Sequence, residues 1–293
     1  MRLGLAVSAA TLGGTTDSAV LLDAAAEAGV QARLIDWRGA GWDWADAVLL
    51  HTPWDYTDDL PAFTRWLGAT SARRPVFNDP AGVAGNTHKS YLLDLQEAGV
   101  PLPATRLLHA GRQVDTTALR AVFGESAVVA KPAVGAGGRR LSRLPTVADL
   151  QGSALVDVDG VPSVDILVQE FVPSVVTGGE SSLVMIAGHP SHLVRKVPAA
   201  GDFRVQASYG GSERLVELDR TAATVAQLVQ PWVAGLAYAR VDYVLDGTGA
   251  PLVMELELTE PDLFLRHCPD AARVLVEHVA GGVRSNGHPG SDD

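Results

Sequence analysis

Residues 238–259 read Tyr-Ala-Arg-Val-Asp-Tyr-Val-Leu-Asp-Gly-Thr-Gly-Ala-Pro-Leu-Val-Met-Glu-Leu-Glu-Leu-Thr, two alternating runs on either side of a glycine-rich turn. The pattern predicts a β-hairpin with strands at 238–246 and 251–259. Pairing that is symmetric about the turn places Asp242 opposite Glu255 and Arg240 opposite Glu257, and opposite residues share a face. One face is therefore expected to carry Arg240, Asp242, Val244, Val253, Glu255 and Glu257, and the other Val241, Tyr243, Leu245, Leu252, Met254, Leu256 and Leu258.

Three carboxylates on one face of a hairpin need an explanation, because like charges that lie opposite one another destabilise a sheet. A divalent cation would supply it, since Mg²⁺ prefers oxygen ligands and is commonly shared between a few carboxylates and the phosphates of a substrate. The alternative is a solvated face on which Arg240 and Glu257 form one ion pair. The apolar reverse face and the two lysines described next favour the magnesium site.

Lys89 lies at the start of a helix predicted over residues 86–98, which Gly99 and Pro101 end. A cation there opposes the helix dipole, but together with free N–H groups it makes a site for an anion. An exposed surface lysine is an equally good explanation of this residue taken alone.

Lys131 ends an apolar strand predicted at residues 127–132, and Gly135-Ala136-Gly137-Gly138 follow it. Backbone without side chains can approach phosphates closely and can move as a flap. The loop is neither a P-loop nor a dinucleotide fingerprint, because the sequence contains no GxxxxGK[ST] and no GxGxxG. The loop alone is therefore a weak signal for a nucleotide.

The first third of the chain alternates strands, predicted at 3–9, 31–37 and 46–52, with helices at 15–28 and 58–67. This order predicts a parallel sheet covered by helices, and ligands bind such sheets beyond the carboxyl ends of the strands. Thr15, Asp17, Asp55 and Tyr56 occupy that position and are predicted substrate contacts, although helix capping and turn formation explain the first three equally well. Further strands are predicted at 139–144, 165–171, 181–188, 192–197 and 214–218, helices at 221–235 and 270–279, and a disordered tail at 285–293.

Composition narrows the class of protein. The 293 residues include 23 Lys and Arg against 34 Asp and Glu, a formal charge of −11, which disfavours a nucleic-acid partner. The single cysteine, Cys268, excludes a disulfide framework and fits a reducing compartment. No apolar stretch approaches the ~18 residues of a membrane helix. A cytoplasmic protein without a membrane partner is expected, as a monomer or a homodimer.

Taken together, these residues resemble the ATP-grasp superfamily of carboxylate–amine ligases. The matching elements lie between about residues 86 and 265 and follow the family order: Lys89, Lys131 with its glycine loop, Gln169-Glu170-Phe171, Glu180, Arg240-x-Asp242 and Glu255-x-Glu257. Longer strings resemble the group of ligases that contains cycloserine synthetase: Gly179-Glu180-Ser181-Ser182-Leu183, Gly201-Asp202-Phe203-Arg204, Tyr209-Gly210-Gly211 and residues 255–263.

The resemblance implies an ATP-grasp fold of mixed α/β and α+β class. A parallel-sheet domain would span residues 1–85, a central domain with a glycine-loop lid 86–172, and an antiparallel-sheet domain 173–293. It also implies the roles of the site residues. Lys89 and Lys131 would hold phosphates under Gly135, Gly137 and Gly138. The adenine would contact Gln169, Glu170 and Val172, and the ribose Glu180. One or two Mg²⁺ ions, with Mn²⁺ as an alternative, would bind to Asp242, Glu255 and Glu257, and Arg240 would stabilise the acyl-transfer intermediate.

Two further cations, Lys196 and Arg204, would help to neutralise phosphate charge, although an exposed strand and an exposed turn explain them equally well. The superfamily often has Asn at the position of Glu257, so the extra charge leaves the number of metal ions open.

The implied chemistry is the conversion of a carboxylate, a poor electrophile, into an acyl phosphate that a nitrogen nucleophile attacks. The protein's part is positioning and charge neutralisation. For the cycloserine group, an amino-acid-like substrate, O-ureido-D-serine, would be activated at its carboxylate and attacked by its own ureido nitrogen, with loss of CO2 and ammonia. Two alternatives stay open: a ligase that joins an amino-acid carboxylate to a separate amine, and a nucleotide-binding protein that has lost catalysis.

Overall fold

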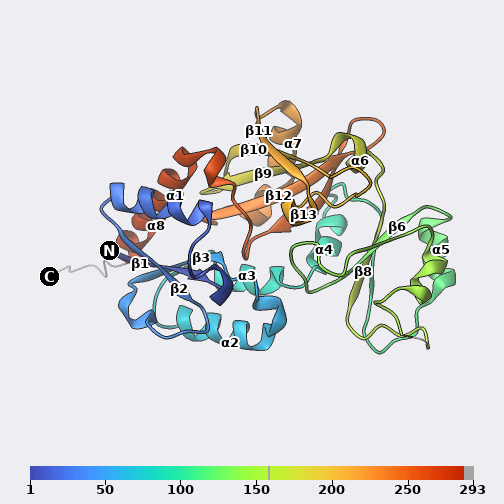
Figure 1. Cartoon of the computed structure of the whole chain (residues 1–293), viewed down its shortest axis with the longest axis horizontal. Helices are drawn as coiled ribbons and strands as arrows, with labels where there is room; N and C mark the ends of the chain where they lie inside the picture. The colour runs from blue at the N-terminus through green and yellow to red at the C-terminus, as the bar shows by residue number, and fades with distance from the viewer. Residues whose placement is uncertain (158, 287–293) are drawn as a thin grey trace.

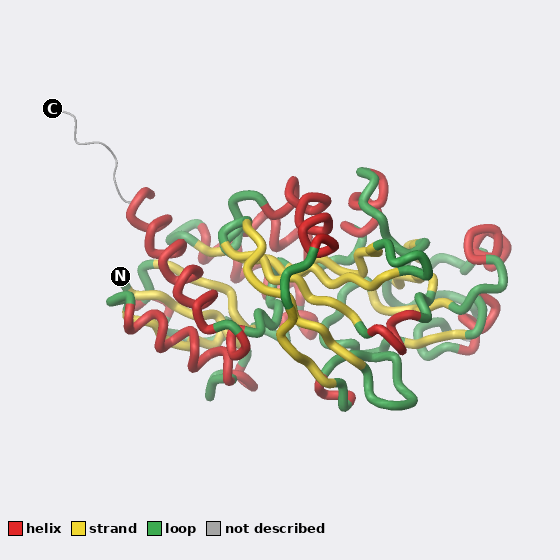
Figure 2. The backbone as a smooth tube through the Cα atoms, turned by 90° about the horizontal axis from the view of Figure 1, so that it is seen from above, coloured by secondary structure: helices red, strands yellow, loops and turns green. Residues whose placement is uncertain are grey.

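Three β-sheets form the framework of the protein, whose structure is a computed structural model that describes residues 1–157 and 159–286. The sheets follow one another along the long axis of the molecule (Figure 1). Seen from above, the strands run through the middle of the molecule (Figure 2). Within the described residues, no helix is both long and apolar enough to span a bilayer. Short 3₁₀ helices occupy Ala9–Thr11, Trp42–Trp44, Tyr56–Asp58, Val147–Gly152, Ala207–Tyr209 and Leu265–His267.

The N-terminal sheet is parallel, as the sequence predicts. Its strand order is β2-β1-β3-β4, with β1 at Arg2–Val7, β2 at Gln31–Asp36, β3 at Ala47–Thr52 and β4 at Val76–Phe77. The crossover helices are α1 (Thr16–Glu27) and α2 (Leu60–Ser71), which lie on opposite faces of the sheet (Figure 1). Because all strands point the same way, their carboxyl ends meet at one edge, next to the rest of the molecule.

The last helix, α8 (Pro269–Asn286), returns to the N-terminal sheet and packs beside α1 (Figure 1). Its buried residues Leu275, Val276 and Val279 belong to the same apolar core as the strands of that sheet. The helix is longer than the predicted 270–279. Of the predicted tail at 285–293, residues 287–293 lie outside the described residues.

The second sheet is antiparallel, in the order β5-β8-β6-β7. Its strands are β5 (Thr105–Leu108), β6 (Val128–Pro132), β7 (Ser142–Leu144) and β8 (Ile166–Glu170), and α5 (Thr116–Phe123) shares an apolar core with it. The sequence pattern predicts neither β5 nor α5, and β7 is shorter than the strand predicted at 139–144. Lys131 lies near the end of β6.

The third sheet is antiparallel, in the order β11-β10-β9-β12-β13. Its strands are β9 (Glu180–Ile186), β10 (His189–Val197), β11 (Ser212–Val216), β12 (Tyr238–Leu245) and β13 (Pro251–Glu257). The helix α7 (Arg220–Val233) buries its apolar residues against the sheet, and the short α6 (Ser174–Gly178) precedes β9. The predicted hairpin is thus β12 and β13, at one side of this sheet.

The hairpin register is confirmed where the charges lie: Arg240 pairs with Glu257 and Asp242 with Glu255. Between these pairs and the turn, a β-bulge shifts the register, so that Tyr243 pairs with Val253. The predicted faces of Met254 and Val253 are therefore wrong, because Met254 lines the cavity described below while Val253 is fully buried in the core. Bulges often lie next to active sites, where they redirect a side chain.

The prediction of one helix over residues 86–98 is wrong. The structure has two short helices there, α3 (Pro80–Asn86) and α4 (Tyr91–Glu97). Tertiary hydrogen bonds interrupt the helix. The side chain of Asn86 donates to the carbonyl of Leu256 and accepts from the N–H of Leu258, and the N–H of Lys89 donates to the carbonyl of Ala133. Lys89 consequently lies in the turn between the helices rather than in a first helical turn.

Asn78 fastens the end of the N-terminal sheet to the hairpin. Its buried amide donates to the carbonyls of Tyr238 and Leu258 and accepts from the N–H groups of Ala237 and Tyr238. Every donor and acceptor of this side chain is used, and such fully satisfied buried amides fix the relative position of the segments that they join.

Candidate active site

A cavity of about 960 Å³ lies where the three sheets meet. Most of the predicted site residues line it: Asp55, Tyr56, Lys89, Lys131, Gly135, Gly137, Gly138, Gln169, Glu170, Val172, Glu180, Arg204, Arg240, Asp242, Glu255 and Glu257. Three predicted residues, Lys196, Thr15 and Asp17, are not part of the lining. The cavity size is typical of a site for a small molecule or cofactor.

Asp242 is the most deeply buried acid of the hairpin, with 4% of its surface exposed. Two nitrogens of Arg240 donate to its carboxylate at 3.0 and 2.9 Å, and Lys196 Nζ lies 3.2 Å away. Burial alone would raise the pKa of Asp242, but Arg240 and Lys196 outweigh it and hold the pKa well below its usual range. Asp242 is therefore ionised at neutral pH.

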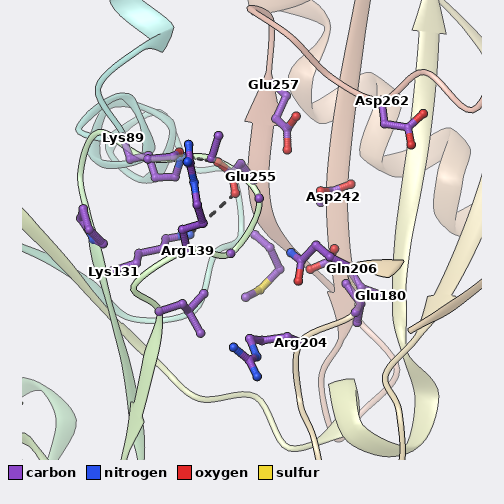
Figure 3. Close-up of a pocket in the computed structure, with 18 of the residues that line it drawn as sticks. Lys89, Lys131, Arg139, Glu180, Arg204, Gln206, Asp242, Glu255, Glu257 and Asp262 are labelled. Atoms are coloured by element: carbon purple, nitrogen blue, oxygen red, sulfur yellow. Dashed lines mark hydrogen bonds and ion pairs between the residues drawn. The ribbon is translucent and has the colours of Figure 1, made fainter. Parts of the chain in front are cut away.

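Glu255 lies between the two predicted phosphate-binding lysines. Its carboxylate is 2.6 Å from Lys89 Nζ and 3.9 Å from Lys131 Nζ, and the lysines approach the hairpin from the opposite side of the cavity (Figure 3). Burial opposes the charge of Glu255, but the lysines outweigh it and lower its pKa. Burial and the neighbouring Lys89 lower the pKa of Lys131. For Lys89, burial is opposed by Glu255, Glu257 and Glu260, which together outweigh it and raise the pKa.

Glu257 contacts the guanidinium of Arg240, which also donates to the carbonyl of Asp262 at 3.2 Å. Burial raises the pKa of Glu257 to about 7, with Arg240 opposing and Glu255 and Asp242 adding to the shift. The extra charge at this position is thus only partly compensated by the protein itself.

Lys196 is 5% exposed and lies behind the cavity wall, 2.6 Å from Glu180 and 3.2 Å from Asp242. It is neither on an exposed strand nor in reach of the cavity. This geometry favours a positioning role for Lys196 over direct contact with a ligand. Arg204, in contrast, lines the cavity, held by Asp202 at 2.7 Å and stacked 3.6 Å over the ring of Tyr209.

The three hairpin acids fit a magnesium site that is completed by a ligand. Across residues 1–157 and 159–286, no three His, Cys, Asp or Glu side chains form a ready-made metal cage. Each acid instead contacts at least one cation of the protein. Mg²⁺ usually takes one or two carboxylates together with water and substrate phosphates, so this donor set suits it without a preformed cage.

The glycine loop spans the cavity and touches both of its sides. Tyr209 Oη donates to the carbonyl of Gly138 at 3.3 Å, and Arg139 donates to Thr57 Oγ1 at 3.1 Å. Gly138 has φ = +69°, and a Cβ there would lie 3.1 Å from Gln206 Oε1. The loop thus needs glycine for its backbone conformation and for the space that it leaves.

The end of β8 supplies the predicted adenine contacts. Gln169 is 1% exposed; its Nε2 donates to Thr105 at 3.1 Å, while its Oε1 has no partner among the described residues. A buried acceptor without a donor suits an amino group of a bound base. The N–H of Glu170 donates to the carbonyl of Ala104 at 2.9 Å, so this donor is not free for a base.

The predicted substrate contacts divide between two places. Asp55 and Tyr56 line the large cavity, and Asp55 also accepts from the indole of Trp37 at 2.7 Å. Thr15 caps α1 by accepting from the N–H of Ser18. Asp17 binds Arg266 at 2.8 Å; with Thr15 it lines a second cavity of about 190 Å³ next to the first.

Comparison with known proteins identifies the family to which the chain belongs. Residues 108–261, more than half of the chain, match the family described as prokaryotic glutathione synthetase, ATP-grasp domain. The chain belongs to the ATP-grasp family. As an ATP-grasp protein it is an ATP-dependent ligase, and the predicted fold is confirmed.

Other similarities reach beyond the ATP-grasp domain to the N-terminal sheet. Residues 3–78 match the family described as D-cycloserine synthetase DcsG, N-terminal domain. The chain is 29% identical to "Cycloserine biosynthesis protein DcsG" of Streptomyces lavendulae, over 95% of this chain and 97% of that protein. It is 25% identical to a glutathione synthetase of Ralstonia nicotianae, over 75% of this chain and 65% of that protein.

Solved structures show the same ATP-grasp fold. The crystal structure of D-cycloserine synthetase DcsG aligns with a TM-score of 0.82 at 24% identity, over 97% of this chain and 100% of that chain. A D-alanine–D-alanine ligase from Bacillus anthracis aligns with a TM-score of 0.66 at 15% identity, over 98% of each chain.

Sequence reasoning missed several residues that build the ATP-grasp site. Asn78 and Asn86 clamp the hairpin, and neither carries a motif that marks this role. Arg266 joins Asp17 to Asp262 and Glu213, and so connects α1 with the loop after β13 and with β11. The one signal for this network in the sequence was the position of Asp17 beyond the carboxyl end of a predicted parallel strand, where ligands bind such sheets.

Gly179 is expected to be sensitive to substitution. It has φ = +73°, and a Cβ there would lie 2.2 Å from the carbonyl oxygen of Lys196. Gly179→Ala must push apart the ends of β9 and β10, where Glu180 meets Lys196. We expect the free energy of unfolding in urea to fall by about 3 kcal/mol.

Gly178 provides the matched control for this substitution. No heavy atom lies within 4 Å of a Cβ built there. Gly178→Ala is expected to change the unfolding free energy by less than about 1 kcal/mol. Equal losses in both variants would contradict the close approach of Gly179 to β10.

His51 makes stability depend on pH. It lies near the end of β3, is 6% exposed and hydrogen-bonds Ser18 Oγ at 2.8 Å. The charged groups that line the small cavity beside it are Asp17, Asp262 and Arg266. Burial lowers the pKa of His51 to about 4, with Asp262 opposing weakly. The folded state therefore keeps His51 neutral, while the unfolded state takes up a proton below about pH 6.5.

The sign of this linkage is a loss of stability as the pH falls from about 6.5 toward 4. Between pH 7 and pH 5 we expect His51 to account for a loss of about 2 kcal/mol in the urea unfolding free energy. His51→Gln should remove this part of the pH dependence. His189→Gln, at an exposed histidine, should leave the pH dependence as it is in the wild type, and a wild-type slope in His51→Gln would refute the assignment.

Proposed function

We propose that this ATP-grasp ligase closes the D-cycloserine ring from O-ureido-D-serine. The observation that carries the proposal is the arrangement of Asp242, Glu255 and Glu257 on a buried hairpin, facing Lys89 and Lys131 across the cavity. The choice of substrate is supported by similarity to a cycloserine biosynthesis protein over 95% of the chain, including the substrate-side N-terminal sheet.

In this proposal the nucleotide lies between the second and third sheets. Lys89 and Lys131 bind its phosphates under the glycine loop, and the end of β8 holds the base, where Gln169 Oε1 is open to the base's amino group. Asp242, Glu255 and Glu257 would hold Mg²⁺, which would offset the negative charge of the phosphates during transfer. Because Glu255 pairs with both lysines in this structure, nucleotide phosphates compete with its carboxylate for them.

The substrate carboxylate attacks the terminal phosphate of ATP; the new P–O bond forms, the P–O bond to ADP breaks, and the products are an acyl phosphate and ADP. The ureido nitrogen bonded to oxygen then attacks the acyl carbon; the C–N bond forms, the C–O bond to phosphate breaks and the nitrogen loses its proton. Hydrolysis of the remaining carbamoyl group consumes water and releases CO2 and ammonia. Arg240 places its guanidinium at the acid cluster, where it can stabilise the negative charge that develops on the acyl oxygen.

An ADP-release assay tests the function. With ATP, Mg²⁺ and O-ureido-D-serine as the lone organic substrate, we expect stoichiometric ADP and cycloserine with no added amine. The L-isomer and common amino acids serve as comparison substrates. ADP release that requires a second amine would overturn ring closure in favour of an amide-forming ligase, the activity class that the likeness to glutathione synthetases supports. The proposal places the enzyme in the cytoplasm, which supplies its ATP.

A further inference from the structure

Glu260 is a buried acid of the cavity that lies outside the proposed phosphate and metal sites. It lies in the loop after β13, lines the large cavity and is 9% exposed. Within the described part of the chain, no side chain or backbone group forms a hydrogen bond or ion pair with its carboxylate. Its backbone carbonyl accepts from the indole of Trp54 at 3.1 Å, which fixes the loop against the end of the N-terminal sheet.

The lack of a partner sets Glu260 apart from the other buried acids that line the cavity. Glu255 has Lys89, Asp242 and Glu257 share Arg240, and Glu180 has Lys196. A carboxyl group that is buried without an ion-pair partner is costly to ionise, and a cation that enters the cavity and pairs with it relieves that cost. Burial and the neighbouring Glu257 raise the pKa of Glu260 to about 8, although the charges of Lys89 and Arg240, with which it forms no ion pair, oppose the shift.

The position of Glu260 suits one end of an amino acid. It follows Glu257 by three residues, so the two acids lie within about 10 Å along the chain. Glu260 also lies where the two cavities approach each other, because Trp54 and Asp262 line both. A substrate whose carboxylate faces Arg240 and the metal ligands would bring its α-ammonium, one carbon away, toward this loop.

We propose that Glu260 binds the α-ammonium group of the substrate and so restricts this ligase to carboxylates that carry a free amino group. The inference rests on the proposed function for the general class of substrate, an amino acid, but not on the identity of its side chain. A bound ammonium favours the ionised form of Glu260, whose negative charge then matches it, while Arg240 lies on the carboxylate side.

The test compares an amino acid with its des-amino counterpart. Binding is measured by calorimetry in the presence of Mg²⁺ and a non-hydrolysable ATP analogue, with O-ureido-D-serine and 3-(ureidooxy)propanoate. If O-ureido-D-serine does not bind, the amino acid that gives the largest thermal shift and its own des-amino acid replace this pair. Failure of the proposed substrate is thus separated from failure of the ammonium site.

We expect the wild type to prefer the amino acid by about 100-fold, and Glu260→Gln to bind both compounds with equal, weak affinity. Glu277→Gln, the same change on the exposed face of α8, should keep the wild-type preference. Affinity for the ATP analogue should stay within about twofold in both variants. Gln keeps the size of the side chain and replaces a carboxyl group that has no ion-pair partner, so the variant is expected to fold, which thermal unfolding verifies. A wild type without the preference, or a Glu260→Gln variant that keeps it, would overturn the proposal.

Discussion

Replacing Asp242 by Asn is expected to lower kcat by at least about a thousandfold, which corresponds to about 4 kcal/mol of transition-state stabilisation. The reason is that Asp242 is the proposed metal ligand whose charge the protein secures most firmly, through Arg240 and Lys196. Steady-state ADP release over a range of Mg²⁺ concentrations measures the effect. The fold is expected to survive, because Arg240 keeps Glu257 and Lys196 keeps Glu180 as partners.

Asp246→Asn is the matched control, since Asp246 lies in the exposed turn of the same hairpin and outside the cavity lining. It should leave kcat within about twofold of the wild type. Near-normal turnover in a folded Asp242→Asn variant would remove Asp242 from the proposed metal site.

The second large effect is expected for Arg240→Lys, with kcat falling by about 100- to 1000-fold although the charge is kept. Arg240 uses Nε and Nη2 on Asp242, Nη2 on Glu257 and Nη1 on the carbonyl of Asp262. A single ammonium cannot reproduce this fork. Single-turnover experiments separate the chemical step from nucleotide affinity, which should change by less than about fivefold.

Arg214→Lys serves as the control, because Arg214 lies on the exposed strand β11 and does not line the cavity. Wild-type single-turnover rates are expected for it. If Arg240→Lys loses nucleotide affinity rather than the chemical rate, Arg240 acts in binding and the assigned role is wrong.

The charged half of the hairpin was predictable from the sequence. The short turn defines which residues pair, and the alternation of polar and apolar residues defines which side chains share a face. The bulge at Met254 was not, since an inserted residue leaves no mark in a run of apolar and acidic residues. The break between α3 and α4 was hidden for another reason. Local propensity favours one helix, but the hydrogen bonds of Asn86 with the hairpin, about 170 residues further on, decide otherwise.

The burial of individual lysine and arginine side chains could not be predicted from the sequence either. The sequence around Lys196 is typical of an exposed strand. The side chain nevertheless lies behind Glu180 and Asp242, because β9 separates β10 from the hairpin. The family resemblance identified most residues that line the cavity, since their order along the chain is specific. It gave no reason to select Glu260, whose distinguishing property, the lack of a partner, exists only in three dimensions.

The return of α8 to the first sheet has a consequence for biosynthesis. Its side chains complete the apolar core around β1 and β3, so a nascent polypeptide that has emerged up to α7 still exposes one side of its earliest strands to water. The N-terminal unit can therefore reach its mature form only after α8 has left the ribosome. Until then, chaperones have an apolar surface to protect, and a stalled or truncated product should be a preferred target of cellular proteases.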